Sequence, residues 1–143
     1  MDARRWVLAI AMVALACVPP KDRSDGQLVQ QGRIYTAWLY GSEYNKLWDR
    51  FSPEMRQTFG SVTELASFAG GAVKQLGAER KVVDERVEKA DPYLVYSRAA
   101  SFNKAQRPML IEWSLSRDGD VTGLVVRPAP ADSAKQWEVR SEK

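Results

Sequence analysis

The chain has no histidine and only one cysteine among its 143 residues. Histidine is the commonest general base and a usual zinc ligand, so its absence excludes Ser-His-Asp and Cys-His nucleophile pairs and the common zinc sites. A calcium loop is also missing, because Asp118-Gly119-Asp120 stops after three residues and fits a hairpin turn instead. Gly70-Gly71 is followed by no Lys-Ser or Lys-Thr pair, which excludes a phosphate loop. We expect no metal and no cofactor, and the sequence offers no catalytic residue.

A strong charge of one sign is lacking as well. The 21 Lys and Arg residues face 18 Asp and Glu residues, and the net charge of +3 is spread along the chain. Nucleic-acid-binding proteins usually carry a basic patch or stripe, so a nucleic-acid partner is not expected. What the chain does have is an apolar fraction of 45%, which is typical of a single globular domain.

The N-terminal segment has the features of an export signal. Arg4 and Arg5 precede an apolar stretch over residues 6–18, with small residues at Ala14 and Ala16. A basic start, a short apolar region and small residues at its end indicate a secretory signal peptide, here residues 1–16. The stretch is shorter than the roughly 20 apolar residues that span a bilayer. We therefore predict that the protein is exported.

Cys17 directly follows Val13-Ala14-Leu15-Ala16. This run resembles the lipobox of bacterial lipoproteins, whose cysteine becomes the lipidated first residue of the mature chain. The resemblance predicts a membrane anchor at Cys17, followed by a polar, proline-rich tether over residues 17–26. Simple secretion after cleavage at the same bond and an uncleaved anchor are the alternatives. In such signals an Asp after the cysteine retains the protein in the inner membrane. Val18 stands there instead, which favours the outer membrane in a cell with two membranes.

Apolar periodicity predicts helices first and strands afterwards. Helical spacing covers residues 27–39 and 44–51, Ser52-Pro53 starts a brief third helix, and a Ser61–Glu64 capping signal starts a fourth that ends before Gly77. Alternating β-branched and aromatic residues then predict strands over 81–89, 93–103, 109–116 and 121–127. The short connections predict an antiparallel meander. We expect an α+β domain over residues 27–128, with helices packed on a curved four-stranded sheet, and a polar tail over 129–143 in which Trp137 is the one large apolar residue.

This order of elements resembles the nuclear transport factor two-like, or cystatin-like, cone fold. The segments 48–56, 75–77, 96–98 and 111–115, followed by Asp118-Gly119, are more narrowly similar to a bacterial domain of unknown function. That domain often precedes a serine beta-lactamase-like or alpha/beta-hydrolase domain in exported proteins, and no hydrolase domain follows here. Ser101-Phe102-Asn103-Lys104 matches the short Ser-x-x-Lys pattern of beta-lactamases. It lies at a strand end and the companion motifs are absent, so catalysis at Ser101 and Lys104 is not expected.

The resemblance also implies a pocket, because such cone folds often hold one between the sheet and the first helix. Its lining here would be aromatic: Tyr35, Trp38, Tyr96 and Trp113. The alternative is that these side chains form ordinary core. Arg98 is a candidate anion contact if Tyr96 faces inward, because alternation places both on the face of Ala100 and Phe102.

We therefore expect a non-catalytic, lipid-anchored envelope protein whose domain binds a small apolar ligand or a partner protein. One alternative is an isomerase- or cyclase-like enzyme, which would need a buried carboxylate with a raised pKa. The strand acids Asp84, Glu85 and Glu112 are instead expected at the solvent-exposed surface, with Asp84 and Glu85 on an edge strand. Another alternative is an accessory role for a separately encoded hydrolase.

Overall fold

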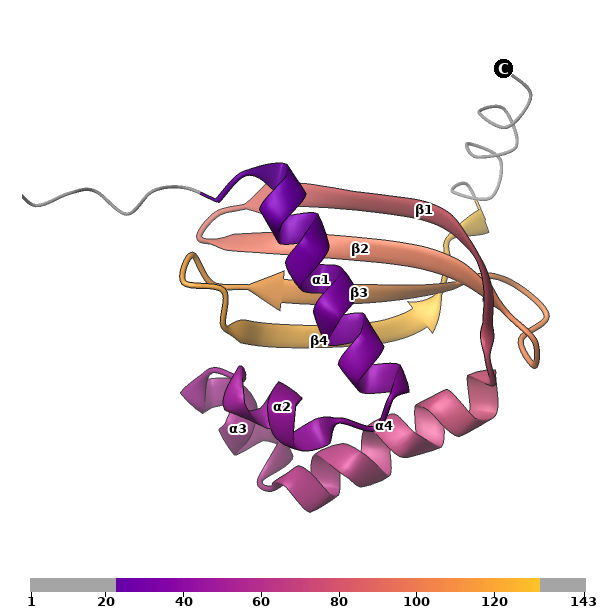
Figure 1. The fold of residues 1–143 in the computed structure, drawn as a ribbon, viewed down its shortest axis with the longest axis horizontal. Helices are drawn as coiled ribbons and strands as arrows, with labels where there is room; N and C mark the ends of the chain where they lie inside the picture. Colours follow the sequence, from indigo (N-terminus) through magenta and orange to yellow (C-terminus); the bar gives the residue numbers. More distant parts are fainter. Residues whose placement is uncertain (1–22, 132–143) are drawn as a thin grey trace, which may run out of the picture.

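The computed structural model describes residues 23–131, which form four helices followed by a four-stranded sheet (Figure 1). The helices are α1 (Asp25–Tyr40), α2 (Tyr44–Asp49), α3 (Pro53–Phe59) and α4 (Val62–Leu76). The strands are β1 (Glu79–Ala90), β2 (Tyr93–Phe102), β3 (Met109–Leu115) and β4 (Val121–Pro128). Each strand pairs antiparallel with the next, and β1 and β4 form the two edges, so the sheet is open. The predicted α+β class and the antiparallel meander are confirmed.

Capping side chains determine where the helices begin. The hydroxyls of Ser52 and Ser61 each accept the backbone N–H three residues further on, as predicted for α3 and α4. The start of α1 lies two residues before the predicted one, because Ser24 and Gln27 form a capping box. The N–H of Gln27 donates to Ser24 Oγ at 3.4 Å, and the N–H of Ser24 donates to Gln27 Oε1 at 3.1 Å. The last residues of the predicted tether therefore belong to α1.

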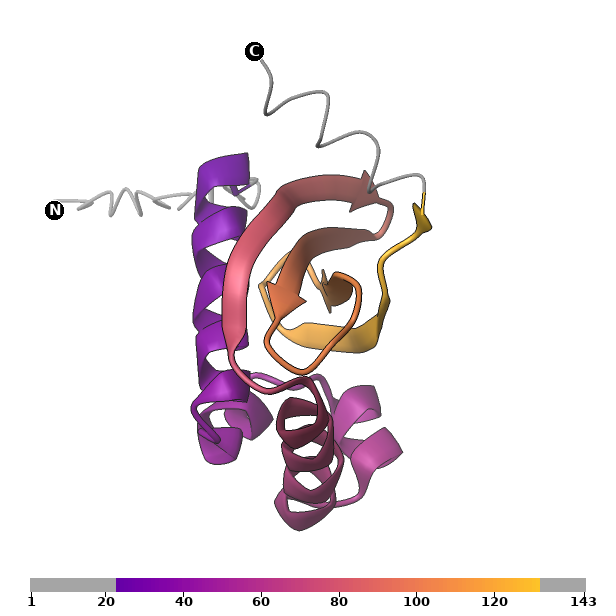
Figure 2. The same ribbon diagram turned by 90° about the vertical axis from the view of Figure 1, so that its right-hand side faces the viewer.

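One helix covers the sheet and the other three gather beside it. Helix α1 crosses one face of the sheet and contacts β1 and β2, whereas α3 contacts β4 (Figure 1). Figure 2 shows that the strands are strongly bent and that α2, α3 and α4 lie together below the sheet. The predicted curved sheet is therefore present, but α1 is the one described helix that lies across its face, and α2, α3 and α4 lie beside the sheet. The helix that positions the groove described below is α1.

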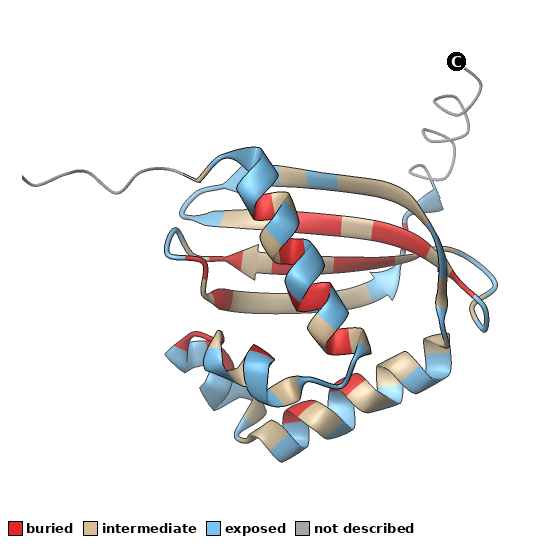
Figure 3. Cartoon of the chain, viewed as in Figure 1, coloured by how far each residue is buried: buried red, intermediate tan, exposed pale blue. Residues whose placement is uncertain are grey.

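Strand alternation builds the core on the α1 side of the sheet. Ile111, Trp113 and Leu115 of β3 are each at most 1% exposed, so this face of the strand points into the core. On β2, the side chains that share a face with Tyr96 are buried or half-buried, as predicted. Figure 3 shows buried residues along α1 and along the central strands that it crosses. The opposite face of β3 carries the more exposed Glu112 and Ser114.

Both chain ends fall outside the described residues. The predicted signal peptide, Cys17, most of the tether and Trp137 all lie there. Packing continues just past the predicted domain end at residue 128, because Ala129 is buried and its N–H donates to the carbonyl of Pro108 at 2.9 Å. Residues 23–131 contain no helix that combines the length and the apolar character needed to cross a bilayer.

Candidate functional site

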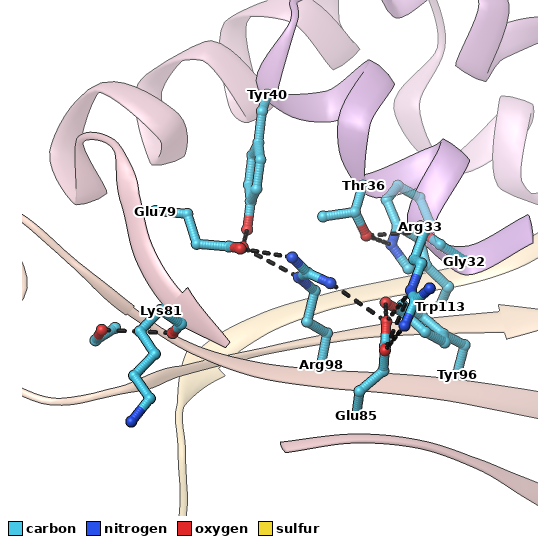
Figure 4. Close-up of polar contacts among 11 residues, drawn as sticks. Gly32, Arg33, Thr36, Tyr40, Glu79, Lys81, Glu85, Tyr96, Arg98 and Trp113 are labelled. Carbon is cyan, nitrogen blue, oxygen red and sulfur yellow. Dashed lines mark hydrogen bonds and ion pairs between the residues drawn. The ribbon is translucent and has the colours of Figure 1, made fainter. Parts of the chain in front are cut away.

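Side chains of α1, β1 and β2 line an open groove of about 480 Å³, which we call the α1–β1 groove (Figure 4). Its lining consists of Arg33, Thr36, Ala37 and Tyr40 from α1, Glu79, Val82 and Glu85 from β1, and Arg98 from β2. The α1 positions follow the spacing i, i+3, i+4, i+7, so a single stripe of the helix forms one wall. A second hollow, of about 610 Å³, lies beside the first turns of α1, and its only charged lining residue is Arg23. The concentration of charged groups makes the α1–β1 groove the candidate site.

Irregularities in β1 explain how both carboxylates come to face α1. Glu79 pairs with Phe102, Val82 with Ala100 and Glu85 with Arg98. Register shifts lie between residues 79 and 81 and between residues 82 and 84. Each shift changes the side of the sheet to which the following residues point, as at a β-bulge. The inward side chains are therefore three residues apart instead of two.

The carboxylate of Glu79 is held by one arginine and one tyrosine. Arg98 binds it in a bidentate contact through one edge of its guanidinium group, with Nη2 2.5 Å from Oε1 and Nε 3.1 Å from Oε2. Tyr40 donates its hydroxyl to Oε2 at 2.9 Å. The Arg98 and Glu79 side chains are only 16% and 17% exposed, so this pair is largely shielded from water. Bidentate arginine–carboxylate pairs are among the stronger ion pairs in proteins.

The carboxylate of Glu85 receives donors from α1 and from β2. Arg33 of α1 reaches it with Nη2 to Oε2 at 2.5 Å and Nε to Oε1 at 2.9 Å. Tyr96 donates its hydroxyl to Oε1 at 2.6 Å, and Arg98 Nη1 lies 3.2 Å from the same oxygen. Figure 4 shows Arg98 between the two carboxylates. Two arginines and two glutamates thus form one network with no net charge.

The network fixes the protonation of its members. The hydrogen bond from Arg33 holds the pKa of Glu85 below its usual range, and this effect outweighs the opposing effect of burial. Burial raises the pKa of Tyr40 and of Tyr96, so both phenols stay protonated and can donate. The hydrogen bond to Glu79 raises the pKa of Arg98 further. Glu85 is therefore an ionised, paired carboxylate, which differs from the raised-pKa acid that a general base in a closed pocket requires.

The four aromatic residues predicted to line a pocket come together in the core. Tyr35, Tyr96 and Trp113 are 2%, 0% and 0% exposed, and Trp38 packs at the edge of the same cluster. The ring centroid of Tyr35 lies 5.6 Å from that of Trp38 and 5.8 Å from that of Trp113. Only Tyr96 reaches the α1–β1 groove, through the hydroxyl that binds Glu85. The groove therefore has a different lining from the predicted one.

Polar atoms within the aromatic cluster are bonded to neighbouring groups. Trp113 Nε1 donates to the hydroxyl of Thr36 at 3.0 Å, and Thr36 donates to the carbonyl of Gly32 at 2.8 Å. Tyr35 donates its hydroxyl to the carbonyl of Gly119 at 2.8 Å. These contacts use the indole N–H and both hydroxyls in holding α1 to the sheet and to the β3–β4 hairpin. The cluster thus behaves as structural core.

The remaining predicted positions lie apart from the groove. Ser101 donates to the carbonyl of Lys81 at 3.4 Å, and Lys104 Nζ donates to the carbonyl of Lys74 at 3.3 Å, so these two side chains do not meet. Glu112 accepts hydrogen bonds from Ser97 and Arg127 on the other face of the sheet. Asp84 pairs with Arg86. Within residues 23–131, no group of three or more acidic or cysteine side chains is arranged to hold a metal ion.

One expectation about charged residues needs correction. Glu85 was expected as a solvated surface charge, yet its side chain is 15% exposed and fully paired. Arg98 does face α1, as the shared face with Tyr96 predicted, but its donors are engaged by Glu79 and Glu85. Arg33, Tyr40 and Glu79 were not singled out from the sequence. The helical spacing from Arg33 to Tyr40 places these two residues on one face of α1, but it gives no signal for Glu79, which lies on β1.

Comparison of the chain with protein-family models, with curated proteins and with solved structures gave no match. The function is therefore argued from the groove and from the N-terminal sequence.

Proposed function

We propose that the protein is an exported lipoprotein of the cell envelope whose domain binds a small, mainly apolar ligand in the α1–β1 groove without chemical conversion. The observation that carries this proposal is an open groove in which every carboxylate is already paired. Such a groove offers volume and contacts, whereas a catalytic acid or base needs a group free to exchange a proton with substrate.

The proposed location rests on the N-terminal sequence. Removal of residues 1–16 leaves Cys17 as the first residue of the mature chain. Attachment of more than one acyl chain at this cysteine can anchor a protein stably in a bilayer. We propose the outer membrane as the site in a cell with two membranes, because Val18 follows the cysteine. We also propose that the bent sheet and its helices represent a nuclear transport factor two-like cone. The element order and α1 crossing one sheet face support this assignment.

The lining of the groove suits an amphipathic small molecule. Ala37 and Val82 provide apolar surface, and Arg33 stands at the rim with a side chain that is 54% exposed. An apolar body can lie against the first two residues while a polar or anionic end meets the arginine. Arg33 can turn toward such a group, because Glu85 would still keep the donors from Tyr96 and Arg98.

The isomerase- or cyclase-like alternative receives less support from the groove. It requires a carboxylate whose pKa is raised by removal from water. The acid beside the core, Glu85, has a lowered pKa because Arg33 binds it. No contact within residues 23–131 favours a role as accessory to a separate hydrolase over ligand binding.

A fluorescent probe with apolar rings and one anionic group tests the groove. We expect anilinonaphthalene sulfonate to gain fluorescence with the full chain, and Ala37→Trp to abolish most of that gain by filling the groove. The control Ser67→Trp adds the same side chain at an exposed position of α4 and should leave the gain intact. An equal gain in all three proteins would show that the probe binds elsewhere and would remove the groove as the ligand site.

The anchor is tested separately. Cells supplied with labelled palmitate should incorporate it into the protein, and Cys17→Ser should lose the label. An unlabelled wild-type chain would rule out lipidation and with it the proposed membrane anchor.

A further inference from the structure

Three segments that are distant in sequence meet at one end of the sheet. They are the entry into α1 at residues 23–24, the β1–β2 turn at residues 89–93 and the β3–β4 hairpin at residues 116–120, and we call them the hairpin end (Figure 1). A meander places these two turns at the same end and the β2–β3 loop at the other. Arg117 joins the turns, with Nη2 3.4 Å from Asp91 Oδ1.

The entry into α1 is bound to this end by several contacts. The guanidinium of Arg23 donates to the carbonyl of Asp118 and to the side chain of Gln31. Gln31 in turn donates to the carbonyl of Gly119 at 3.1 Å. Gly119 has a φ of 88°, a backbone conformation that favours glycine, and its missing side chain leaves room for the guanidinium of Arg23. The chain therefore enters the domain at a fixed point on the hairpin end.

The proposed anchor lies only a few residues before that point. From Cys17 to Arg23 the chain advances six residues, which at 3.3–3.6 Å per residue reach about 22 Å at most. With acyl chains on Cys17 held in a bilayer, Arg23 lies within about this distance of the membrane surface. The two ends of the sheet are separated by the length of a strand, about 23 Å for the seven residues of β3, so only one of them can lie at the headgroups when the strands stand upright on the bilayer.

The exposed residues of the hairpin end suit a phospholipid surface. Tyr93 is 46% exposed beside the exposed Pro92 and Ala90. Tyrosine is enriched at the headgroup level of membranes, where its ring contacts apolar groups and its hydroxyl remains hydrated. Lys89 is exposed beside this turn, and its long side chain can reach headgroup phosphates, whereas Arg117 is paired with the exposed Asp91.

We infer that the hairpin end lies against the phospholipid headgroups, with Tyr93 at headgroup level and the β2–β3 loop directed away from the membrane. This orientation rests on the proposed lipidation of Cys17. The short connection makes the contact intramolecular, so a weak interaction suffices to keep the surface in place. The anchor thus determines the distance of the domain from the bilayer, and the contact at the hairpin end determines which side faces it.

Spin labels at the two ends of the sheet test the orientation in the full, lipidated chain. Lys89→Cys places a label at the hairpin end, and Gln106→Cys places the matched label in the β2–β3 loop; both positions are exposed. The protein is reconstituted into phosphatidylethanolamine–phosphatidylglycerol vesicles that contain a nickel-chelating lipid. We expect the relaxation rate of the label at residue 89 to rise several-fold on addition of nickel, with little change at residue 106. Tyr93→Ser should reduce the difference between the two labels.

Mass measurement of the reconstituted protein separates the two possible failures. Equal relaxation at both positions, or a larger effect at residue 106, in a chain that carries the lipid overturns the orientation and leaves the anchor intact. A chain without lipid on Cys17 overturns both. A difference between the labels that is unchanged by Tyr93→Ser overturns the role of the tyrosine.

Discussion

Gly32 determines how closely α1 approaches the sheet. A Cβ added at this position would lie 2.2 Å from Cγ of Tyr96, which is far closer than van der Waals contact allows. The ring cannot move aside easily, because it is fully buried and its hydroxyl is bound by Glu85. Glycine in a helix interior is normally a weak point, which is all that its position in the sequence indicates. Here the missing side chain is what allows the helix to rest on β2.

We predict that Gly32→Ala lowers the free energy of unfolding by about 1–3 kcal/mol, the usual cost of overpacking a core, despite the higher helix propensity of alanine. The control is Gly26→Ala in the first turn of the same helix, where an added Cβ meets nothing within 4 Å. That variant should be neutral or slightly stabilising. Urea unfolding followed by tryptophan fluorescence measures both. A Gly32→Ala protein as stable as the wild type would mean that α1 is not held at the distance described.

At the scale of elements, local chemistry made the helices and turns predictable. Ser52 and Ser61 predict two helix starts, and Asp118-Gly119 predicts the hairpin, because caps and turns depend on interactions between residues that are close in sequence. Apolar spacing likewise gave the inward face of β3, where Ile111, Trp113 and Leu115 alternate without interruption. Signals of this kind need no knowledge of the rest of the fold.

The groove could not be predicted in the same way, because it depends on the irregular pairing of β1. Simple alternation on this strand would put every second residue inward, yet the side chains that face α1 are Glu79, Val82 and Glu85. The two register shifts that produce this spacing arise only when β1 pairs with β2. A charged strand at a sheet edge therefore indicated solvent exposure, whereas the side chains of Glu79 and Glu85 are only 17% and 15% exposed.

The ion pair between Glu85 and Arg33 makes the packing of α1 on the sheet depend on pH. The pKa of Glu85 is lowered on folding, first of all by the hydrogen bond from Arg33, from an ordinary value of about 4.5. Because the pKa is lowered, ionised Glu85 contributes its full stabilisation of the folded state above about pH 4.5. This contribution is lost as the pH falls through the pKa of Glu85 in the folded protein. We predict that the wild type loses stability between neutral pH and about pH 3 more steeply than Glu85→Gln. Urea midpoints measured across this range provide the comparison.

A neighbouring acid on the same strand serves as the matched control. Glu88 is exposed and pairs with Arg86 at 3.0 Å on the surface, outside the groove. Glu88→Gln should keep the acid sensitivity of the wild type. The assignment to Glu85 fails if both variants follow the wild-type curve, or if Glu88→Gln flattens it as much as Glu85→Gln does.

At the scale of the whole molecule, α1 joins β1, β3 and the β3–β4 hairpin. Its first turns are joined to the β3–β4 hairpin through Gln31 and Tyr35. Its middle contacts β3 through Thr36, and its stripe from Arg33 to Tyr40 reaches both carboxylates of β1. The contacts join residues up to 88 positions apart in the chain. The helix and the sheet should therefore unfold together, since neither keeps its buried groups satisfied alone.

The strands nevertheless differ in how firmly they are held. β2 and β3 pair on both sides and carry the fully buried Tyr96, Trp113 and Leu115, whereas β1 pairs with β2 alone and has no fully buried residue. We predict that native-state hydrogen exchange is slowest in β2 and β3 and that the amides of β1 that point away from β2 exchange early, by local opening. Exchange of β1 at the same rate as β3 in a monomeric sample would contradict this order. Glu85→Gln should speed exchange in α1 more than in β3, because it loosens the contact between the helix and the edge strand while the central pairing stays intact.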